Sequence, residues 1–223
     1  MKTKYQQTLG LILLLLFTGL AFGVHTHAFW VKNADLAFAK LATQTITPHN
    51  TLIFKAIATL GSPAIVLGAT ALLCLWLWYR RDLALAIWVE AIQLFGSAIA
   101  EVCKQLVARA RPIHQLVADS GYSFPSGHTF CTAILVFTLL MLGLPRLHDQ
   151  EVKLVAVVLG LIWVLLVAIA RVYLRDHFAS DVVGSMLLAS GFWLVVTPYA
   201  QVVQTRLRHM LPAKLATFGS TQN

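Results

Sequence analysis

Three clusters of polar and charged side chains interrupt the long apolar runs of this 223-residue chain. In chain order they are Lys104 with Arg111-Pro112, then Pro125-Ser126-Gly127-His128, and then Arg171, His177 and Asp181. Each cluster begins or ends an apolar run. Ionisable groups at membrane depth are costly, so they indicate a functional site. Three cations, two histidines and one carboxylate suit the binding of a phosphate and the cleavage of its ester or anhydride bond.

The first part of this chemistry is to hold the phosphoryl oxygens. The three basic side chains are Lys104, Arg111 and Arg171. The planar fork of an arginine matches two phosphate oxygens at once. Ser126 and Gly127 precede an expected helix, where a hydroxyl, a close backbone approach and the free N–H groups of a helix start favour an anion. We therefore predict a phosphate-binding site built from these five residues.

The second part is bond cleavage, for which the histidines are candidates. His177 and Asp181 are four residues apart, so on a helix the carboxylate would orient the imidazole and raise the basicity of its other nitrogen. This predicts His177 as a nucleophile and Asp181 as the residue that orients it. His128 comes from another helix and is free to protonate the leaving oxygen. No metal or other cofactor is required, because side chains supply the positive charge.

The elements that position these residues are predicted to be membrane helices. Six segments reach or approach the roughly 20 apolar residues that cross a bilayer. They run from about Leu9 to Trp30, Leu52 to Tyr79, Asp82 to Val107, His128 to Leu144, Val152 to Ala170 and Phe178 to Val203. Only 12% of the residues are charged, against about 25% in a soluble domain, and the mean hydropathy is +0.75. We expect one all-α domain over residues 1–223, a bundle of six transmembrane helices.

The region around the first apolar run allows more than one interpretation. Its basic start and the small residues Ala21-Phe22-Gly23 resemble a cleaved signal peptide, but we expect the run to be retained as a helix. After it, Asn33 to Thr43 has apolar residues at helical spacing, with Asp35 and Lys40 off that face. This pattern predicts a short amphipathic helix in the membrane interface, with a plain connecting loop as the alternative.

The distribution of lysine and arginine predicts the orientation. Nine basic residues fall on one side of the expected bundle: Lys2, Lys4, Arg80, Arg81, Arg146, Lys153, Arg206, Arg208 and Lys214. Outside the clusters, the other side has three: Lys32, Lys40 and Lys55. The positive-inside rule then places both termini in the cytoplasm and the clusters at the outer face of a cell membrane. No basic surface outside the apolar runs indicates nucleic acid, so the expected partners are membrane lipids and a lipid phosphate.

Several other polar residues lie near the clusters. A stripe on the third helix comprises Glu90, Gln93, Ser97, Glu101 and Lys104. We expect it to line the substrate cavity, or alternatively to form a hydrogen-bonded seam between helices. Arg109, Arg175 and Asp176 flank motif residues and are predicted to be rim charges, while Asp119 is expected to shape the entrance. The three cysteines have no zinc-like spacing and imply no disulfide framework.

Taken together, the clusters resemble the signature of the type 2 phosphatidic acid phosphatase superfamily. Its members include membrane lipid phosphatases, soluble bacterial acid phosphatases and vanadium haloperoxidases. The family pattern is Lys, six residues and Arg-Pro, then Pro-Ser-Gly-His, then Ser-Arg, five residues, His, three residues and Asp, and every spacing is present here. One residue departs from it, since Ala170 stands where the family has serine. We expect this to remove a hydroxyl that helps to bind phosphate.

The resemblance implies a fold, an activity and a mechanism. The membrane branch, of the phosphatidylglycerophosphate phosphatase B and undecaprenyl-diphosphatase type, has six helices and uses a phosphohistidine intermediate. Candidate substrates are undecaprenyl diphosphate, phosphatidylglycerol phosphate and phosphatidic acid, and an outward site favours the first. One alternative is a phosphotransferase that uses the same phosphohistidine. Another is a non-catalytic lipid-phosphate binder, against which the intact His128, His177 and Asp181 argue.

Overall fold

The computed structural model describes residues 2–211, which form helices and connections without a strand. The α-helices are α1 (Lys2–His25), α2 (Phe29–Gln44), α3 (Pro48–Leu60), α4 (Pro63–Tyr79), α5 (Leu83–Val107), α6 (Gly127–Gly143), α7 (Gln150–Tyr173), α8 (Ala179–Val196) and α9 (Ala200–Met210). Two short 3-10 turns follow α6 and α8, at Leu144–Arg146 and Thr197–Tyr199. Lys214, which contributed to the predicted orientation, lies outside the described residues.

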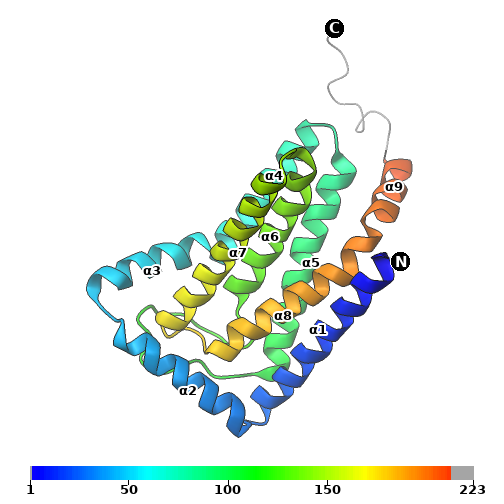
Figure 1. Cartoon of the computed structure of the whole chain (residues 1–223). Coiled ribbons are helices and arrows are strands. Elements are labelled where there is room, and N and C mark those ends of the chain that lie inside the picture. Colours follow the sequence, from blue (N-terminus) through cyan, green and yellow to red (C-terminus); the bar gives the residue numbers. More distant parts are fainter. Residues whose placement is uncertain (1, 212–223) are drawn as a thin grey trace.

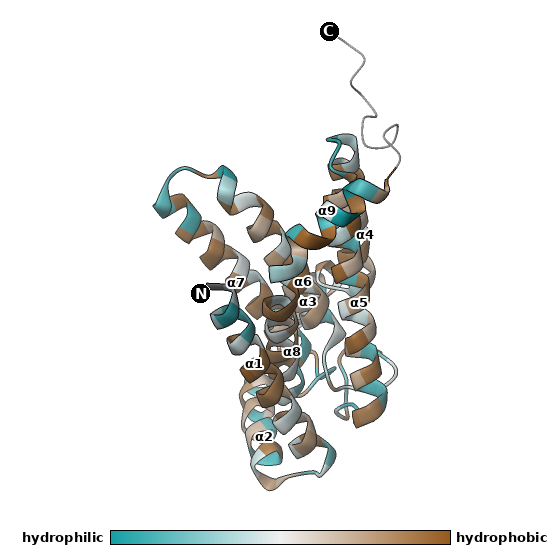
Figure 2. Ribbon diagram, turned by 90° about the vertical axis from the view of Figure 1, so that its right-hand side faces the viewer, coloured by the Kyte–Doolittle hydropathy of each residue, from teal (hydrophilic) through white to brown (hydrophobic). Residues whose placement is uncertain are grey.

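The described helices include the transmembrane spans that the hydropathy predicted. Five segments are long and apolar enough to cross a membrane, namely Thr3–His25, Leu83–Val107, Gly127–Arg146, Gln150–Tyr173 and Ala179–Met210. The pair α3 and α4 makes a sixth if it counts as one bent span. Figure 2 shows hydrophobic residues along these helices and hydrophilic residues toward several of their ends. The chain is therefore a multi-pass membrane protein, and the all-α prediction is confirmed.

The second span is broken where the sequence predicted a continuous helix from Leu52 to Tyr79. Its two halves, α3 and α4, meet at a bend of 43°. Ser62 caps α4 by accepting a hydrogen bond from the backbone N–H of Ile65, at 3.4 Å. Pro63 then occupies the first turn of α4, where its missing N–H costs nothing but prevents continuation from α3. The prediction of one continuous helix was wrong. Ser62 and Pro63 separate α3 from α4, but they lie within a run that reads as continuously apolar.

The bundle is built around α6, which packs against α4, α5, α7 and α8. Phe130 and Ile134 of α6 are fully buried in its core. The first helix, α1, lies along α8 (Figure 1). Their contact is close because Gly10 and Gly191 face each other, and a Cβ on either residue would approach the other's carbonyl oxygen to 3.0 Å. Small residues at such a crossing let membrane helices approach closely.

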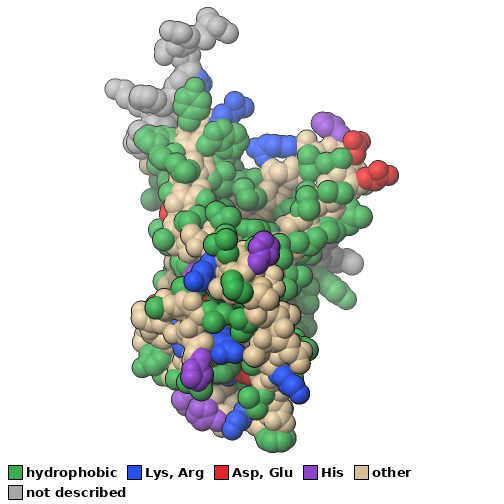
Figure 3. All heavy atoms as spheres, turned by 90° about the vertical axis from the view of Figure 1, so that its left-hand side faces the viewer, with side chains coloured by type: hydrophobic (Ala, Val, Ile, Leu, Met, Phe, Trp, Pro, Cys, Tyr) green, Lys and Arg blue, Asp and Glu red, His purple; other side chains and the backbone are tan. Residues whose placement is uncertain are grey.

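The interfacial helix is present and is longer than the predicted Asn33–Thr43. α2 runs across the end of the bundle, where it contacts α7 and α8 (Figure 1). Its apolar residues Phe29, Trp30 and Leu36 are exposed, whereas Asp35 is buried. The alternative of a plain loop is therefore wrong. On the side where α3 lies, Lys, Arg and His side chains are spread over the lower end of the molecule (Figure 3).

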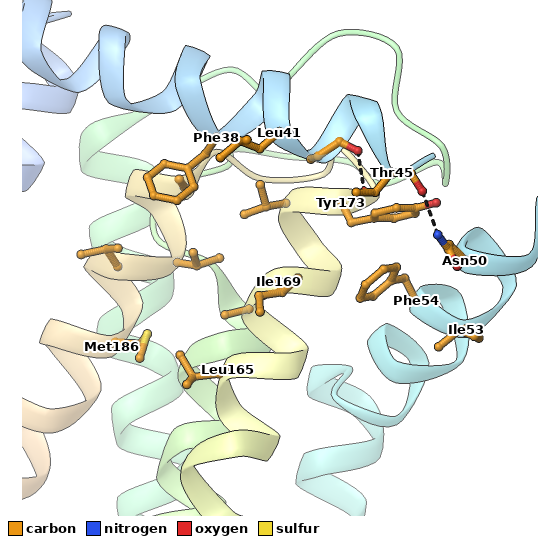
Figure 4. Close-up of a pocket in the computed structure, with 16 residues that line it drawn as sticks. Phe38, Leu41, Thr45, Asn50, Ile53, Phe54, Leu165, Ile169, Tyr173 and Met186 are labelled. Atoms are coloured by element: carbon orange, nitrogen blue, oxygen red, sulfur yellow. Dashed lines mark hydrogen bonds between the residues drawn. The ribbon is translucent and has the colours of Figure 1, made fainter. Parts of the chain in front are cut away.

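An apolar groove of about 670 Å³ lies under α2, between α3, α7 and α8 (Figure 4). Ile169 and Val183 line it and are also half exposed, so the groove is continuous with the surface that faces lipid. Arg171 and Asp181 belong to the same two helices, α7 and α8, but are almost completely buried. Neither of these two residues lines the groove.

The middle of the polar stripe on α5 forms a seam between helices. Gln93 is buried, and its Nε2 donates a hydrogen bond to the carbonyl oxygen of Cys131 on α6, at 3.4 Å. Ser97 donates to the carbonyl oxygen of Gln93 at 2.7 Å and lies 3.4 Å from the Sγ of Cys131. Farther along, Glu101 is exposed and lies 3.8 Å from Lys104. The seam interpretation therefore holds for Gln93 and Ser97. Lys104, at the end of the stripe, lies beside Gly127 of the second cluster.

Candidate active site

The structure brings the three predicted clusters together at one end of the bundle. The segment from 108 to 126 leads from α5 to α6 without a helix, and the α7–α8 connection lies beside it. Backbone hydrogen bonds join the segment to this connection, from Leu116 N to Leu174 O at 2.9 Å, and to the first turn of α8, from Ser126 N to Asp181 O at 3.3 Å. These bonds fix the relative positions of residues that are more than fifty apart in sequence. The basic residues and the histidines of the three clusters therefore share one site.

The predicted nucleophile and its partner face each other. Nδ1 of His177 lies 3.4 Å from Oδ2 of Asp181, and both side chains are almost fully buried. The sequence argument placed both residues on one helix, but α8 begins at Ala179 and His177 precedes it. The pair forms because Asp181, in the first turn, also accepts a hydrogen bond from the backbone N–H of Phe178 at 2.8 Å. That bond turns the chain so that His177 lies against the carboxylate.

The other imidazole nitrogen points toward the cations. Nε2 of His177 lies 3.3 Å from Nη1 of Arg111. A guanidinium can only donate, so Nε2 is the acceptor and the proton resides on Nδ1, toward Asp181. Burial lowers the pKa of His177 below its ordinary value, with Asp181 acting in the opposite direction. The imidazole is therefore neutral near pH 7, with a lone pair directed into the site.

The two arginines are held in place by groups around the site. Arg111 donates from Nε to the carbonyl oxygen of Gly121 at 3.1 Å, and from Nη1 to that of Asp176 at 3.0 Å. Arg171 is 4% exposed, and its Nη1 lies 3.2 Å from Oδ2 of Asp176. Burial raises the pKa of Asp176 to about 6, against the attraction of Arg171. Asp176 was predicted to be a rim charge, which was wrong, since it is fully buried behind both arginines.

Asp119 lies between the two guanidinium groups. Its Oδ2 is 2.5 Å from Nη2 of Arg171 and 3.1 Å from Nη1 of Arg111. Burial acts to raise the pKa of Asp119, but the charges of Arg111 and Arg171 outweigh it and hold the pKa below its usual range. Asp119 therefore contacts the core of the site and does more than shape its entrance.

The start of α6 completes the site. Ser126 is buried and caps the helix by accepting from the backbone N–H of Thr129 at 3.4 Å. Gly127 lies beside Lys104, since a Cβ there would lie 3.8 Å from Nζ of that lysine. His128 follows in the first turn, so a ring nitrogen of this residue, one of His177 and an oxygen of Asp119 all lie within 4.8 Å of one another. Two histidines and four charged side chains thus converge on one small volume.

Asp119, His128 and His177 are also residue types that can bind a metal. However, the carboxylate is already paired with both Arg111 and Arg171. Two guanidinium groups around one carboxylate disfavour a further cation and favour an anion. The donor set therefore fits phosphate better than a metal ion.

Two residues of the site were not recognised from the sequence. Arg109 was predicted to be a rim charge, but its side chain is 13% exposed and lies 2.6 Å from both Asp35 and Asp181. Asp35 was expected on the polar face of the interfacial helix, but it is buried. A signal existed, since Arg109 lies two residues from Arg111 and Asp35 is the one acidic residue between positions 1 and 81. Sequence alone does not pair them.

The position of Ala170 changes the interpretation of the missing serine. Ala170 is fully buried in an apolar cluster with Ala58, Tyr173 and Leu174. A hydroxyl at this position would therefore lie among apolar side chains of α3 and α7. The expectation that Ala170 removes a phosphate-binding group has no support in this packing.

The helical bundle and the anion-binding site with two histidines define a membrane-embedded phosphatase. The family model of the PAP2 superfamily matches residues 9–204, and the chain belongs to this superfamily. Phosphatidylglycerophosphatase B of Bacillus subtilis is 31% identical over 200 residues, which cover 86% of this chain and 95% of that protein. An undecaprenyl-diphosphatase of Sulfolobus acidocaldarius is 25% identical over 68% of this chain and 69% of that protein.

A solved structure supports the same assignment. The crystal structure of a transmembrane PAP2-type phosphatidylglycerolphosphate phosphatase from Bacillus subtilis matches with a TM-score of 0.72 and 26% identity. The match covers 92% of this chain and 98% of that one. The predicted family and fold are thereby confirmed, and the protein is a membrane lipid phosphatase of the PAP2 superfamily.

Proposed function

We propose that this enzyme removes phosphate from a lipid phosphate or diphosphate through a phosphohistidine on His177. The observation that carries the proposal is the geometry of this residue. Its Nδ1 faces Asp181 at 3.4 Å, and its Nε2 faces Arg111 at 3.3 Å. A neutral imidazole that directs a lone pair toward guanidinium groups is arranged to attack a phosphorus atom bound there.

The reaction has two displacement steps. In the first, Nε2 of His177 forms a bond to phosphorus while the bond from phosphorus to the lipid oxygen breaks, and His128 donates a proton to that oxygen. In the second, water attacks the phosphohistidine, His128 removes the water's proton, and inorganic phosphate leaves. Asp181 stabilises the positive charge that develops on the imidazole.

The cations hold the phosphoryl oxygens through both steps. The groups that we assign to this role are Lys104, Arg111, Ser126, Gly127 and Arg171. Binding displaces Asp119 from the two guanidinium groups, because phosphate and carboxylate compete for the same donors. The arginines are already positioned by Asp176 and by backbone carbonyls, so little reorganisation is needed when substrate replaces Asp119.

For the substrate, we infer undecaprenyl diphosphate or phosphatidylglycerol phosphate, with phosphatidic acid as a third candidate. The site lies at the end of the bundle opposite most of the lysine and arginine residues that flank the spans. The positive-inside rule then places the termini in the cytoplasm and the site at the outer face of the plasma membrane. Undecaprenyl diphosphate is released at that face during wall synthesis. The names of the relatives point to the same two lipids.

The test measures phosphate release by detergent-purified enzyme from each of the three lipids, with EDTA present. We expect release by the wild type and none by His177→Ala. His114→Ala is the matched control, since His114 is an exposed histidine of the α5–α6 connection. Substrate labelled with ³²P should leave acid-labile label on the wild-type protein. Full activity of His177→Ala would refute the proposed nucleophile, and no release from any of the lipids would refute the substrate class.

A further inference from the structure

Arg109 contacts the catalytic carboxylate on the side away from the histidine. Its Nη1 lies 2.6 Å from Oδ1 of Asp181, whereas Oδ2 of the same carboxylate faces His177. The guanidinium also lies over the ring of Phe178, with 3.8 Å between Cζ and the ring centroid. Arg109 thus contacts Phe178, which follows His177 in the chain, and Asp181, which orients the imidazole of His177.

The second amino group of Arg109 reaches the interfacial helix. Nη2 lies 2.6 Å from Oδ2 of Asp35, which is 4% exposed. Asp35 also accepts hydrogen bonds from the backbone N–H and the hydroxyl of Ser180, both at 2.8 Å. Ser180 directly precedes Asp181 in the first turn of α8. One arginine and one serine therefore join α2 to the turn that carries Asp181.

We propose that Arg109 and Asp35 are positioning residues for the reaction, and that they fix Asp181 against His177 and set the charge that the imidazole experiences. This inference rests on the proposed role of His177. Three charges form a line from α2 inward: the carboxylate of Asp35, the guanidinium of Arg109 and the carboxylate of Asp181. Arg109 partly neutralises Asp181, and Asp35 in turn partly neutralises Arg109.

This arrangement predicts opposite effects for two neutral substitutions. The charge of Arg109 disfavours protonation of His177. Arg109→Gln should therefore move the acidic limb of the pH profile of kcat/KM to higher pH. Asp35→Asn removes the negative charge beside Arg109. The positive charge of Arg109 then acts more strongly on His177, which should move that limb to lower pH. The loss of one unit charge from this partly buried network should shift the acidic limb by about one pH unit.

The other titratable or charged groups around His177 remain the same in both variants. They are Lys104 of α5, Arg111 and Asp119 of the α5–α6 connection, His128 of α6, Arg171 of α7, Asp176 of the α7–α8 connection and Asp181 of α8. A difference between the two profiles therefore reports Arg109 and Asp35. A structural role alone would lower kcat or stability without moving the limb in opposite directions.

A double-mutant cycle tests whether Arg109 acts through Asp181. Arg109→Gln should lower kcat by about 100-fold, the upper range for loss of a group that orients a catalytic ligand. In an Asp181→Asn background the same change should lower kcat by less than about threefold, because residues that act as a unit are not additive. Arg175→Gln is the control. Arg175 lies at the same end of the bundle as Arg109 but donates a hydrogen bond to Thr43. Its replacement should leave kcat and the acidic limb unchanged.

The experiment uses full-length enzyme with undecaprenyl diphosphate and phosphatidylglycerol phosphate, with His177→Ala assayed in parallel. Opposite shifts and a non-additive cycle would support the proposal. The proposal would be overturned if neither variant moved the acidic limb, or if the losses of kcat in the double-mutant cycle multiplied. In either case an inactive His177→Ala would leave the proposed nucleophile standing. Activity of His177→Ala would instead refute the proposed nucleophile. If Arg109→Gln does not fold, Asp35→Asn carries the pH test alone, since an asparagine oxygen can still accept from Ser180.

Discussion

The contact between α8 and the segment before α6 leaves no room for a methyl group at Gly184. A Cβ at this position would lie 2.6 Å from Cε2 and 2.7 Å from Cζ of Phe124. The ring of Phe124 is fully buried. The same ring stacks on Phe17, with 5.7 Å between the ring centroids. The ring therefore has little freedom to move away from an added methyl group.

The substitution Gly184→Ala should destabilise the protein. Overpacking of a filled core costs typically about 1–3 kcal/mol. Alanine recovers about 1 kcal/mol of this through its better helix propensity. Because the ring is fully buried and stacked on Phe17, we take the upper part of the range and expect a net loss of about 1–2 kcal/mol. For a chain of this size that corresponds to a melting temperature lower by about 4 °C.

The activity should fall as well, because Phe124 lies two residues before Ser126 of the proposed phosphate site. Displacement of the ring moves the start of α6, so we expect a higher KM together with a lower kcat. Thermal unfolding in detergent, followed by tryptophan fluorescence, and phosphate release from the same samples measure the two effects.

Gly68→Ala is the matched control for this prediction. Gly68 lies within α4, and a Cβ there would meet nothing within 4 Å. The same chemical change should therefore leave activity unchanged and raise the melting temperature slightly through helix propensity. Equal melting temperatures for the two variants would refute the argument from packing.

Three further predictions concern the reacting groups. Asp119→Asn should lower KM by about tenfold, because substrate no longer displaces a carboxylate from Arg111 and Arg171; a higher KM in initial-rate assays would contradict this. The buried, neutral His177 has a lowered pKa, so kcat/KM should stay constant down to about pH 6.5 and fall only below it; a fall already at pH 7.5 would contradict that direction. His128→Gln should slow release from lipid phosphates far more than from p-nitrophenyl phosphate, whose leaving group needs no acid; equal losses would contradict its role as the acid.

The spans and the interfacial helix could be predicted because their signals are local. An unbroken apolar run specifies a membrane helix wherever it packs, and the spacing within Asn33–Thr43 indicated a helix in the interface. The break between α3 and α4 has a local cause in Ser62 and Pro63. It was missed because hydropathy averages over the two residues that end one helix and begin the next.

The buried charge network could not be predicted in the same way. Arg109 was separated from Asp35 by 74 residues and from Asp181 by 72, and nothing in the spacing pairs them. A charged residue next to a motif is usually solvated, so a rim position was the reasonable expectation for Arg109 and Asp176. Their burial depends on α2 and the α7–α8 connection folding over the same end of the bundle.

The sequence by itself determined the class of the protein, because the motifs of the PAP2 superfamily are short and local and the apolar runs mark the membrane spans. Tertiary structure decided which charges meet. It placed Asp119 between Arg111 and Arg171, put Ala170 into an apolar cluster, and joined α2 to Asp181 through Arg109. The physical reason is that hydropathy and helical spacing act over a few residues, whereas the energy of a buried charge depends on partners brought from distant parts of the chain.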